Sequence, residues 1–176
     1  MADKHILHML SPLAQVSPFD VNMALDAGFD AVVPYSGITI GEVRGLVQDA
    51  MFSRPPKHGA KTGFFFGGKD AIIALDMMEA AKKAMVAPFA VSLFADPAGS
   101  FTTAAALVAR VEKVVKTKRR RELNGLSVVV YGATGVVGFA SGVIAALHGA
   151  TVTLAGYDGT ARVEKAAAEI QRRFGV

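Results

Sequence analysis

The feature that most constrains the fold is a glycine-rich turn between an apolar strand and an apolar helix. Three β-branched residues, Val128 to Val130, precede the turn, and a second strand-like run begins at Thr151. The turn itself has the spacing G-x-x-G-x-x-G and reads Gly132-Ala133-Thr134-Gly135-Val136-Val137-Gly138. The order strand, glycine turn, helix, strand is typical of the first βαβ unit of a dinucleotide-binding fold.

Each glycine of the turn has a physical role in such a unit. Gly132 allows the sharp turn from strand to helix, Gly135 leaves the backbone open to a pyrophosphate, and Gly138 lets the helix approach the strand closely. The amide groups that open the helix would face the phosphates, and the helix dipole would favour them. We therefore predict that residues 132–138 bind the pyrophosphate of a dinucleotide.

The same region could be interpreted as a membrane span, because no charged residue lies between Glu122 and Asp158. An uncharged run longer than about 18 residues is a transmembrane candidate. However, glycines interrupt this run repeatedly, and a buried parallel strand with its packed helix would also lack charge. We favour the buried βαβ unit and expect no membrane association.

The composition of the chain excludes several classes of protein. The chain of 176 residues is 52% apolar and contains no cysteine, which excludes a disulfide scaffold and a cysteine nucleophile. The apolar run near the N-terminus is too short for a signal peptide, so we expect a cytoplasmic protein. Much of the net charge of +4 is local and comes from Lys113, Lys116, Lys118, Arg119, Arg120 and Arg121. No aromatic residue interleaves with these cations, which favours a solvated helix end over a nucleic-acid site.

Strand and helix patterns alternate along the whole chain. We expect strands at residues 5–10, 31–34, 62–66 and 89–94, and a helix after Asp70 whose inner face carries Ile72, Leu75, Met78 and Ala81. The predicted fold class is α/β: a doubly wound parallel-sheet domain followed by a Rossmann-type NAD(P)-binding domain. We place the first domain at residues 1–99, a bridging helix at 100–122 and the nucleotide domain at 123–176. Only two strands follow Glu122, so we expect the nucleotide domain to be incomplete.

Polar and glycine-rich residues follow the predicted strands, where ligands of parallel α/β sheets bind. These strand exits supply Ser11, Tyr35, Ser36, Gly67, Gly68, Lys69, Asp70, Asp96, Ser100, Thr102 and Thr103. Glycine and aspartate at such positions could also serve only as turn formers and helix caps. The histidines lack the spacing of a metal site, and no G-x-S-x-G motif is present, so we expect neither a metal centre nor a serine hydrolase.

Five segments of the chain together resemble one family, the bacterial NAD(P)-dependent methylene-tetrahydromethanopterin dehydrogenases. They are SPFDVNMALDAGFD, PYSGIT, FFFGGKDA, DPAGSFTTAAA and YGATGVVG. The resemblance implies hydride transfer from methylene-tetrahydromethanopterin, or from methylene-tetrahydrofolate, to NAD or NADP in the one-carbon metabolism of methylotrophs. It also implies a homo-oligomer that binds the pterin between two domains. Family members are longer than this chain.

Hydride loss from the methylene carbon leaves a cation shared by two nitrogens, so negative potential nearby would assist the reaction. Asp20, Asp70 and Asp96 are the candidate catalytic carboxylates. The candidate substrate-binding residues are Tyr35, Lys69, Ser100, Thr102 and Thr103. The glycine motif would also suit another dehydrogenase, such as one acting on shikimate or an amino acid, or a non-catalytic NAD(P) sensor.

The choice between NAD and NADP depends on the end of the second strand of the βαβ unit. Asp158 lies near the position of the acidic residue that binds the ribose hydroxyls of NAD, with Tyr157 before it. Arg162, four residues further on, could attract the phosphate of NADP. We therefore expect these three residues to contact the cofactor, and both nicotinamides to be used.

Overall fold

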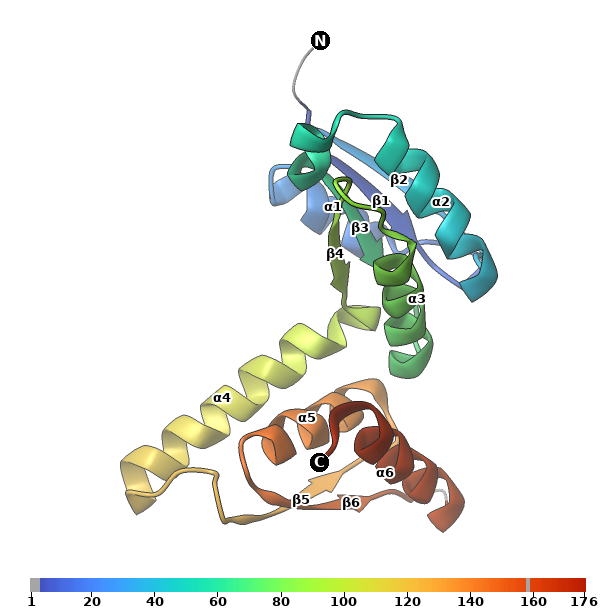
Figure 1. The fold of residues 1–176 in the computed structure, drawn as a ribbon. Helices are drawn as coiled ribbons and strands as arrows, with labels where there is room; N and C mark the ends of the chain where they lie inside the picture. The colour runs from blue at the N-terminus through green and yellow to red at the C-terminus, as the bar shows by residue number, and fades with distance from the viewer. Residues whose placement is uncertain (1–3, 158) are drawn as a thin grey trace. The chain divides into compact units, whose positions relative to one another are not determined.

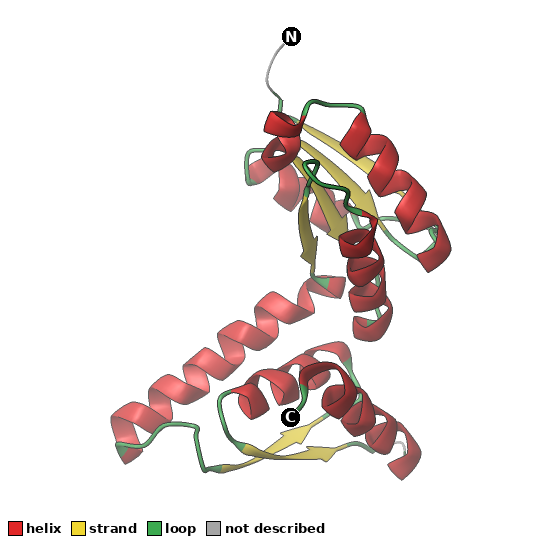
Figure 2. Cartoon of the chain, viewed as in Figure 1, coloured by secondary structure: helices red, strands yellow, loops and turns green. Residues whose placement is uncertain are grey.

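The computed structural model describes residues 4–157 and 159–176. The chain forms two compact units, of which the first ends at Ala98 and the second is Gly99–Val176. Strands and helices alternate in both units (Figures 1 and 2), and every strand pair in the described part of the chain is parallel. These observations confirm the predicted α/β fold with a parallel sheet.

The first unit is a four-stranded sheet in the order β2-β1-β3-β4. Its strands are β1 (Ile6–Leu10), β2 (Ala31–Tyr35), β3 (Thr62–Phe66) and β4 (Ser92–Ala95). Its helices are α1 (Pro18–Asp26), α2 (Ile40–Phe52) and α3 (Ala71–Ala84), with short 3-10 helices η1 (Pro56–Lys61) and η2 (Pro97–Gly99). Helices α2 and α3 pack side by side on one face of the sheet, and α1 lies on the other (Figure 1).

The two faces of this sheet have separate apolar cores, because side chains alternate along each strand. On the α1 side, Leu7 and Met9 pack with Ala24 of α1. On the other side, Phe64 and Phe66 of β3 are almost fully buried. Burying each such large apolar side chain contributes roughly 1.5–3 kcal/mol. The two cores therefore fix the register of β1 and β3, whose ends carry the candidate site.

The buried face of α3 differs from the predicted one. The residues that face inward are Ala71, Ala74, Met77, Ala81 and Ala84. Of the predicted set only Ala81 is fully buried, whereas Ile72, Leu75 and Met78 are partly exposed. The predicted set followed a spacing of three residues along the helix. The alanines instead face inward because small side chains let the helix lie close to the sheet and to α2.

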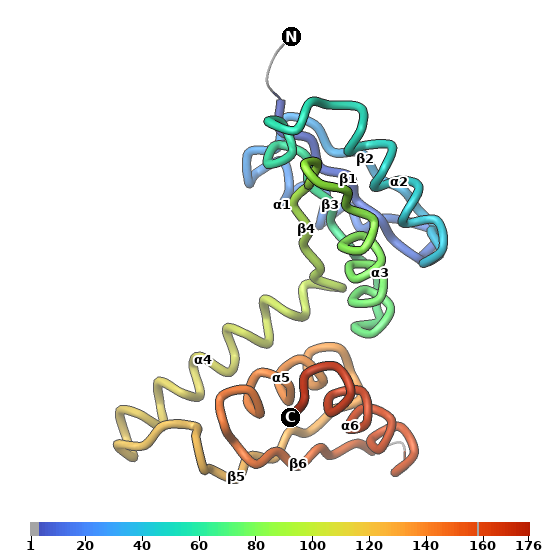
Figure 3. Tube along the Cα trace, viewed as in Figure 1, coloured from blue at the N-terminus to red at the C-terminus, as the bar shows by residue number. Residues whose placement is uncertain are grey.

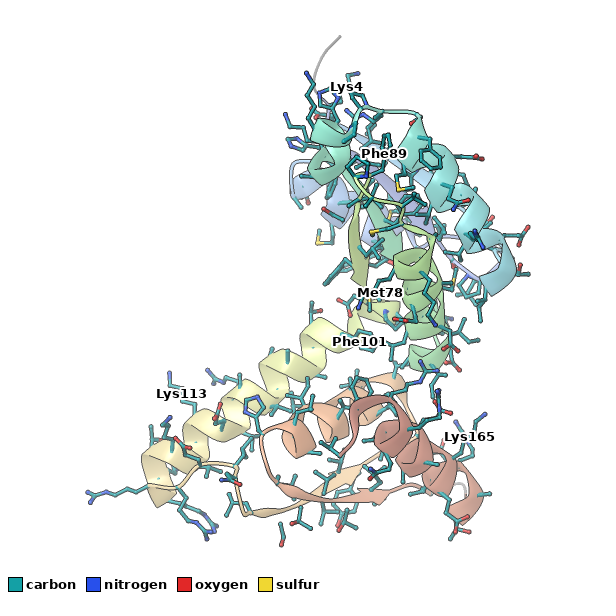
Figure 4. All side chains as sticks on the ribbon, viewed as in Figure 1. Lys4, Met78, Phe89, Phe101, Lys113 and Lys165 are labelled. Carbon is teal, nitrogen blue, oxygen red and sulfur yellow. The ribbon has the colours of Figure 1, made fainter. Side chains whose placement is uncertain are left out.

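The fourth strand also begins later than predicted, at Ser92 rather than at Phe89. Phe89 lies in a turn, where its amide donates to the Val86 carbonyl at 2.8 Å. Its ring packs edge-on against Phe52 at a centroid distance of 5.2 Å (Figure 4). Phe89 therefore anchors the loop before the strand, which explains an apolar residue outside the sheet.

The second unit contains the glycine turn (Figure 3). Its elements are α4 (Ser100–Arg119), β5 (Ser127–Tyr131), α5 (Val136–Leu147), β6 (Thr151–Ala155) and α6 (Thr160–Phe174). Helix α4, which we expected to be a bridge, packs along α5 and groups with the second unit. Among the described residues, no helix is both long enough and apolar enough to cross a membrane.

Candidate functional site

A cleft of about 580 Å³ opens at the carboxyl ends of β1 and β3. These two strands are neighbours in the sheet, but the chain leaves β1 toward β2 and leaves β3 toward β4. Such a reversal of strand order is the place where parallel α/β sheets bind ligands. The cleft is lined by the loop after β1, the first turn of α1 and the loop after β3.

The floor of this cleft at the end of β3 is backbone without side chains. Gly67 continues the sheet, since its amide donates to the Leu10 carbonyl at 3.0 Å. Gly68 has a φ of +115°, and a Cβ there would lie 3.2 Å from Cγ and Cδ of Pro12. A side chain at Gly68 would therefore be strained in conformation and crowded in space. The two glycines keep this part of the cleft open.

Two of the three candidate carboxylates lie near each other, and one of them, Asp20, lines this cleft. Asp20, in the first turn of α1, lines the cleft and is partly buried. Burial raises the pKa of Asp20, and the nearby charge of Asp96 raises it further. Asp96 follows β4 directly and is only 6% exposed. The raised pKa of Asp20 means that burial favours the protonated form of this carboxyl.

The third candidate carboxylate, Asp70, has a structural role. It is the N-cap of α3, and its Oδ1 accepts hydrogen bonds from the amides of Ile72 at 2.8 Å and Ile73 at 3.0 Å. Asp70 does not line the cleft, whereas its neighbour Lys69 does. The structure therefore supports the alternative interpretation of Asp70, that it is a helix cap.

Tyr35 also lies apart from the residues that line the cleft. Its hydroxyl is 3.1 Å from Nδ1 of His8. The His8 ring stacks on Phe64 at a centroid distance of 5.0 Å. Burial lowers the pKa of His8, and the charge of Arg54 lowers it further, so the neutral ring is favoured. Tyr35, His8 and Phe64 lie on the face of the sheet that α2 and α3 cover. The contacts of Tyr35 with this group indicate a role in packing.

The polar residues predicted on the strand exit after β4 lie in the first turn of α4. Thr102 and Thr103 each donate a hydrogen bond from Oγ1 to the Gly99 carbonyl, at 3.3 Å and 2.6 Å. Ser100 is fully buried, and its hydroxyl has no hydrogen-bond partner within the described part of the chain. These three residues belong to the second unit, whereas Asp20, Lys69 and Asp96 belong to the first.

The glycine turn has the geometry that the sequence predicted. Gly132 has a φ of +68°, which glycine adopts without strain. The Gly135 amide donates to the Gly132 carbonyl at 3.0 Å, which closes the turn before α5. A Cβ on Gly138 would lie 2.7 Å from the Gly132 carbonyl carbon, closer than a side chain can approach. At Gly135, by contrast, the nearest atom would be the Gly132 oxygen at 3.4 Å, so the exposed side of the turn is open.

The other residues of the motif support this turn. Ala133 is buried, and its amide donates to the Ala155 carbonyl of β6 at 3.1 Å. Thr134, Val136 and Val137 are partly exposed at the start of α5. The first amides of an α-helix have no partner inside the helix. The turn therefore offers backbone donors beside a surface without side chains, as an anionic ligand requires.

The predicted cofactor-selecting residues are only partly described. Tyr157 is 95% exposed just after β6, and Arg162 lies in the first turn of α6. Asp158 lies outside the described residues. Its contact with a ribose stays a prediction, as does that of Arg162 with a phosphate.

Sequence reasoning missed part of the lining of the first cleft. Leu13, Ala14 and Gln15 of the loop after β1 line it, as does Phe65 of β3. The loop has no motif that would have identified it. The strand order would have located it, because a reversal between β1 and β3 places both following loops at one site. Among the described residues, no three histidine, aspartate or glutamate side chains gather as a metal site would need.

Comparison with known proteins confirms the family resemblance. Residues 18–98 match the family model of the N-terminal region of methylene-tetrahydromethanopterin dehydrogenase. The chain is 51% identical over 173 residues to a protein of Methylorubrum extorquens named NAD(P)-dependent methylenetetrahydromethanopterin dehydrogenase. It is 35% identical over 173 residues to the bifunctional protein MdtA of the same organism. Each alignment covers 98% of this chain and 58% of the relative. The chain thus spans less than two thirds of the length of either relative.

Proposed function

We propose that the protein is an NAD(P)-dependent oxidoreductase of the methylene-tetrahydromethanopterin dehydrogenase kind, whose N-terminal family model matches residues 18–98. It would transfer a hydride from methylene-tetrahydromethanopterin to NAD(P)+ and give the methenyl form, as a step in one-carbon oxidation. Methylene-tetrahydrofolate is the alternative donor. The observation that carries the proposal is the 51% identity over nearly the whole chain to a protein named for this activity.

The turn of the second unit fits the proposed cofactor. The open side of Gly135 and the close packing of Gly138 together form a surface that a pyrophosphate could approach. Residues 132–138 would hold the pyrophosphate, with Tyr157, Asp158 and Arg162 near the ribose. When bound, the nicotinamide supplies the hydride acceptor. The proposal includes use of both NAD and NADP.

The first unit would bind the pterin and assist the chemistry electrostatically. The methylene carbon loses a hydride and no proton, so a general base is not required. Positive charge develops on the two nitrogens beside this carbon. Asp96 would stabilise that charge, and Asp20 would add to the negative potential around the substrate, because a carboxylate shielded from water acts more strongly than one in bulk solvent. Lys69, which lines the same cleft, would position the substrate.

The roles of the remaining candidates change with the contacts described above. The bonds that Thr102, Thr103 and Asp70 make to helix backbone support structural roles for their side chains. Ser100 has an unpartnered hydroxyl but is fully buried, so its contact with a substrate would require the surrounding residues to move. The proposal includes a homo-oligomeric assembly and a cytoplasmic location. Size-exclusion chromatography with light scattering would measure the number of subunits.

The decisive experiment is a hydride-transfer assay of the complete protein with both methylene carriers and both nicotinamides. We expect reduction of NAD and NADP with methylene-tetrahydromethanopterin, and a rate loss of at least tenfold in Asp96→Asn. Lack of any turnover, together with dinucleotide binding, would instead support a sensor of NAD(P). Turnover only with shikimate or an amino acid would support another dehydrogenase.

A further inference from the structure

The cleft of the first unit contains three chemical groups that together can bind a flat polar ring: an apolar wall, an anion and a cation. Phe65 supplies an apolar wall, Asp20 a carboxylate and Lys69 an ammonium group. All three line one cavity of about 580 Å³, which is large enough for a fused two-ring heterocycle. The floor between them is the backbone of Gly67 and Gly68.

The apolar wall extends beyond the cleft along the α1 face of the sheet. Phe65 packs against Phe94 of the edge strand β4 at a centroid distance of 6.0 Å. Phe94 is 52% exposed, although it lies on a sheet face. Phe65 thus contacts a second ring beside it and packs against the core of Leu7, Met9 and Ala24. A wall held in this way can stack against a planar ligand with little loss of side-chain entropy.

The polar groups set the pattern of donors and acceptors that the ligand must match. An ionised carboxylate accepts two hydrogen bonds side by side, and a lysine ammonium group only donates. The pyrimidinone ring of a tetrahydropterin has a matching edge. Its ring N–H and exocyclic amino group are adjacent donors, and the carbonyl beside them is an acceptor.

We propose that Asp20 accepts hydrogen bonds from the ring N–H and amino group of this aminopyrimidinone edge, and that Lys69 donates to its carbonyl. The inference rests on the proposed function and specifies which part of the substrate the first unit recognises. Tetrahydromethanopterin and tetrahydrofolate share this edge. Asp20 and Lys69 would therefore bind both carriers, and discrimination between them must come from other residues.

The environment of Asp20 makes the contact dependent on pH. Burial and the charge of Asp96 raise the pKa of Asp20, and N–H donors stabilise the ionised form. Ligand binding therefore lowers that pKa and releases a proton where the free carboxyl is partly protonated. The affinity should fall as the pH is lowered through the pKa of Asp20.

The test is a double-mutant cycle between the protein and the ligand, measured by isothermal titration calorimetry on the complete protein. The probes are tetrahydrofolate and an analogue that lacks the exocyclic amino group. Removing the amino group should weaken binding to the wild type by roughly ten- to hundredfold, since hydrogen bonds to charged groups contribute about 1.5–3 kcal/mol. In Asp20→Asn the same removal should have much less effect. Asp26→Asn, on the exposed side of the same helix, is the matched control and should behave as wild type.

Lys69→Met provides an independent arm, because Lys69 is exposed and its substitution should not affect folding. This variant should bind tetrahydrofolate more weakly and keep the full penalty for loss of the amino group. Equal penalties in wild type and Asp20→Asn would overturn the inference, even if the enzyme turns over the methylene carrier. A wild type that binds no tetrahydropterin would overturn both the inference and the proposed substrate.

Discussion

Gly138 lies against the backbone of Gly132, with no space between them for a side chain. A Cβ at Gly138 would be 2.7 Å from the Gly132 carbonyl carbon and 2.9 Å from the Cα of Ala133. The start of α5 is therefore held against the end of β5 by contact between backbones. Gly135 lies between these two glycines in sequence, yet a Cβ there would meet only one atom, at 3.4 Å.

This difference predicts opposite phenotypes for two alanine substitutions. Gly138→Ala should destabilise the protein by roughly 1–3 kcal/mol, because overpacking forces the backbone to shift. Gly135→Ala should leave stability nearly unchanged and weaken NAD(P) binding. Urea denaturation and cofactor titration of both variants would measure this. Normal cofactor affinity in Gly135→Ala and in the bulkier Gly135→Val would show that the turn does not hold the pyrophosphate.

The N-cap role of Asp70 predicts a stability effect rather than a catalytic one. Asp70→Ala removes the acceptor of two backbone amides at the start of α3 and should cost about 1 kcal/mol. Asp70→Ser should restore most of this loss, because serine is also a good N-cap. Chemical denaturation measures the stabilities, and the rate of hydride transfer in Asp70→Ser provides the control. A large rate loss in a stable Asp70→Ser variant would contradict the structural role.

We expect the substitution of Asp20 to change the stability of the protein in a way that depends on pH. Its pKa is raised in the folded protein, so the folded state favours the protonated form and loses stability as the pH rises from the unfolded pKa through the folded one. Asp20→Asn removes this loss. The variant should be more stable than wild type at pH 7, by less than about 1 kcal/mol because solvent screens the partly exposed group. Thermal unfolding should show the gain at pH 7 and little gain near pH 3. A lower melting temperature at pH 7 would indicate that Asp20 stabilises the fold.

We expect Arg162 to influence the preference between NADP and NAD. It lies in the first turn of α6, where its charge could attract the phosphate of NADP. Arg162→Ala should lower kcat/KM for NADP several-fold more than for NAD. Lys165→Ala is the matched control, since Lys165 is an exposed cation one turn further along α6 (Figure 4). Equal losses in the two variants would mean that only the general charge of α6 matters.

The sequence predicted the elements whose pattern is local. The glycine turn and β3 lie where their residues indicated, because turn formation and apolar periodicity depend on near neighbours. Local pairing also forms the capping box at the start of α2, where Glu42 accepts from the Thr39 amide at 2.8 Å.

The properties that depend on tertiary packing could not be predicted in this way. The inward face of α3 is set by how closely the helix approaches the sheet, and size therefore mattered more than hydrophobicity. The grouping of Asp20 with Asp96 depends on the strand order, since the two residues are far apart in sequence. Asp70 and Asp96 both follow strands and look equivalent in sequence. Only the structure separates a helix cap from a carboxylate near the cleft.

The hydrogen-bond ladder of the first sheet continues one residue beyond its strands. The Ser11 amide donates to the Tyr35 carbonyl at 3.0 Å, Gly67 to Leu10 at 3.0 Å, and Asp96 to Phe66 at 3.2 Å. The first residue of each of these loops is thus held by the sheet. The loop after β1 is held a second time by the loop after β2, since the Leu13 carbonyl accepts from the Gly37 amide at 2.7 Å. An insertion between Ser11 and Leu13 would therefore disturb two strand exits together, whereas Asp96 after β4 would keep its place on the opposite edge of the sheet.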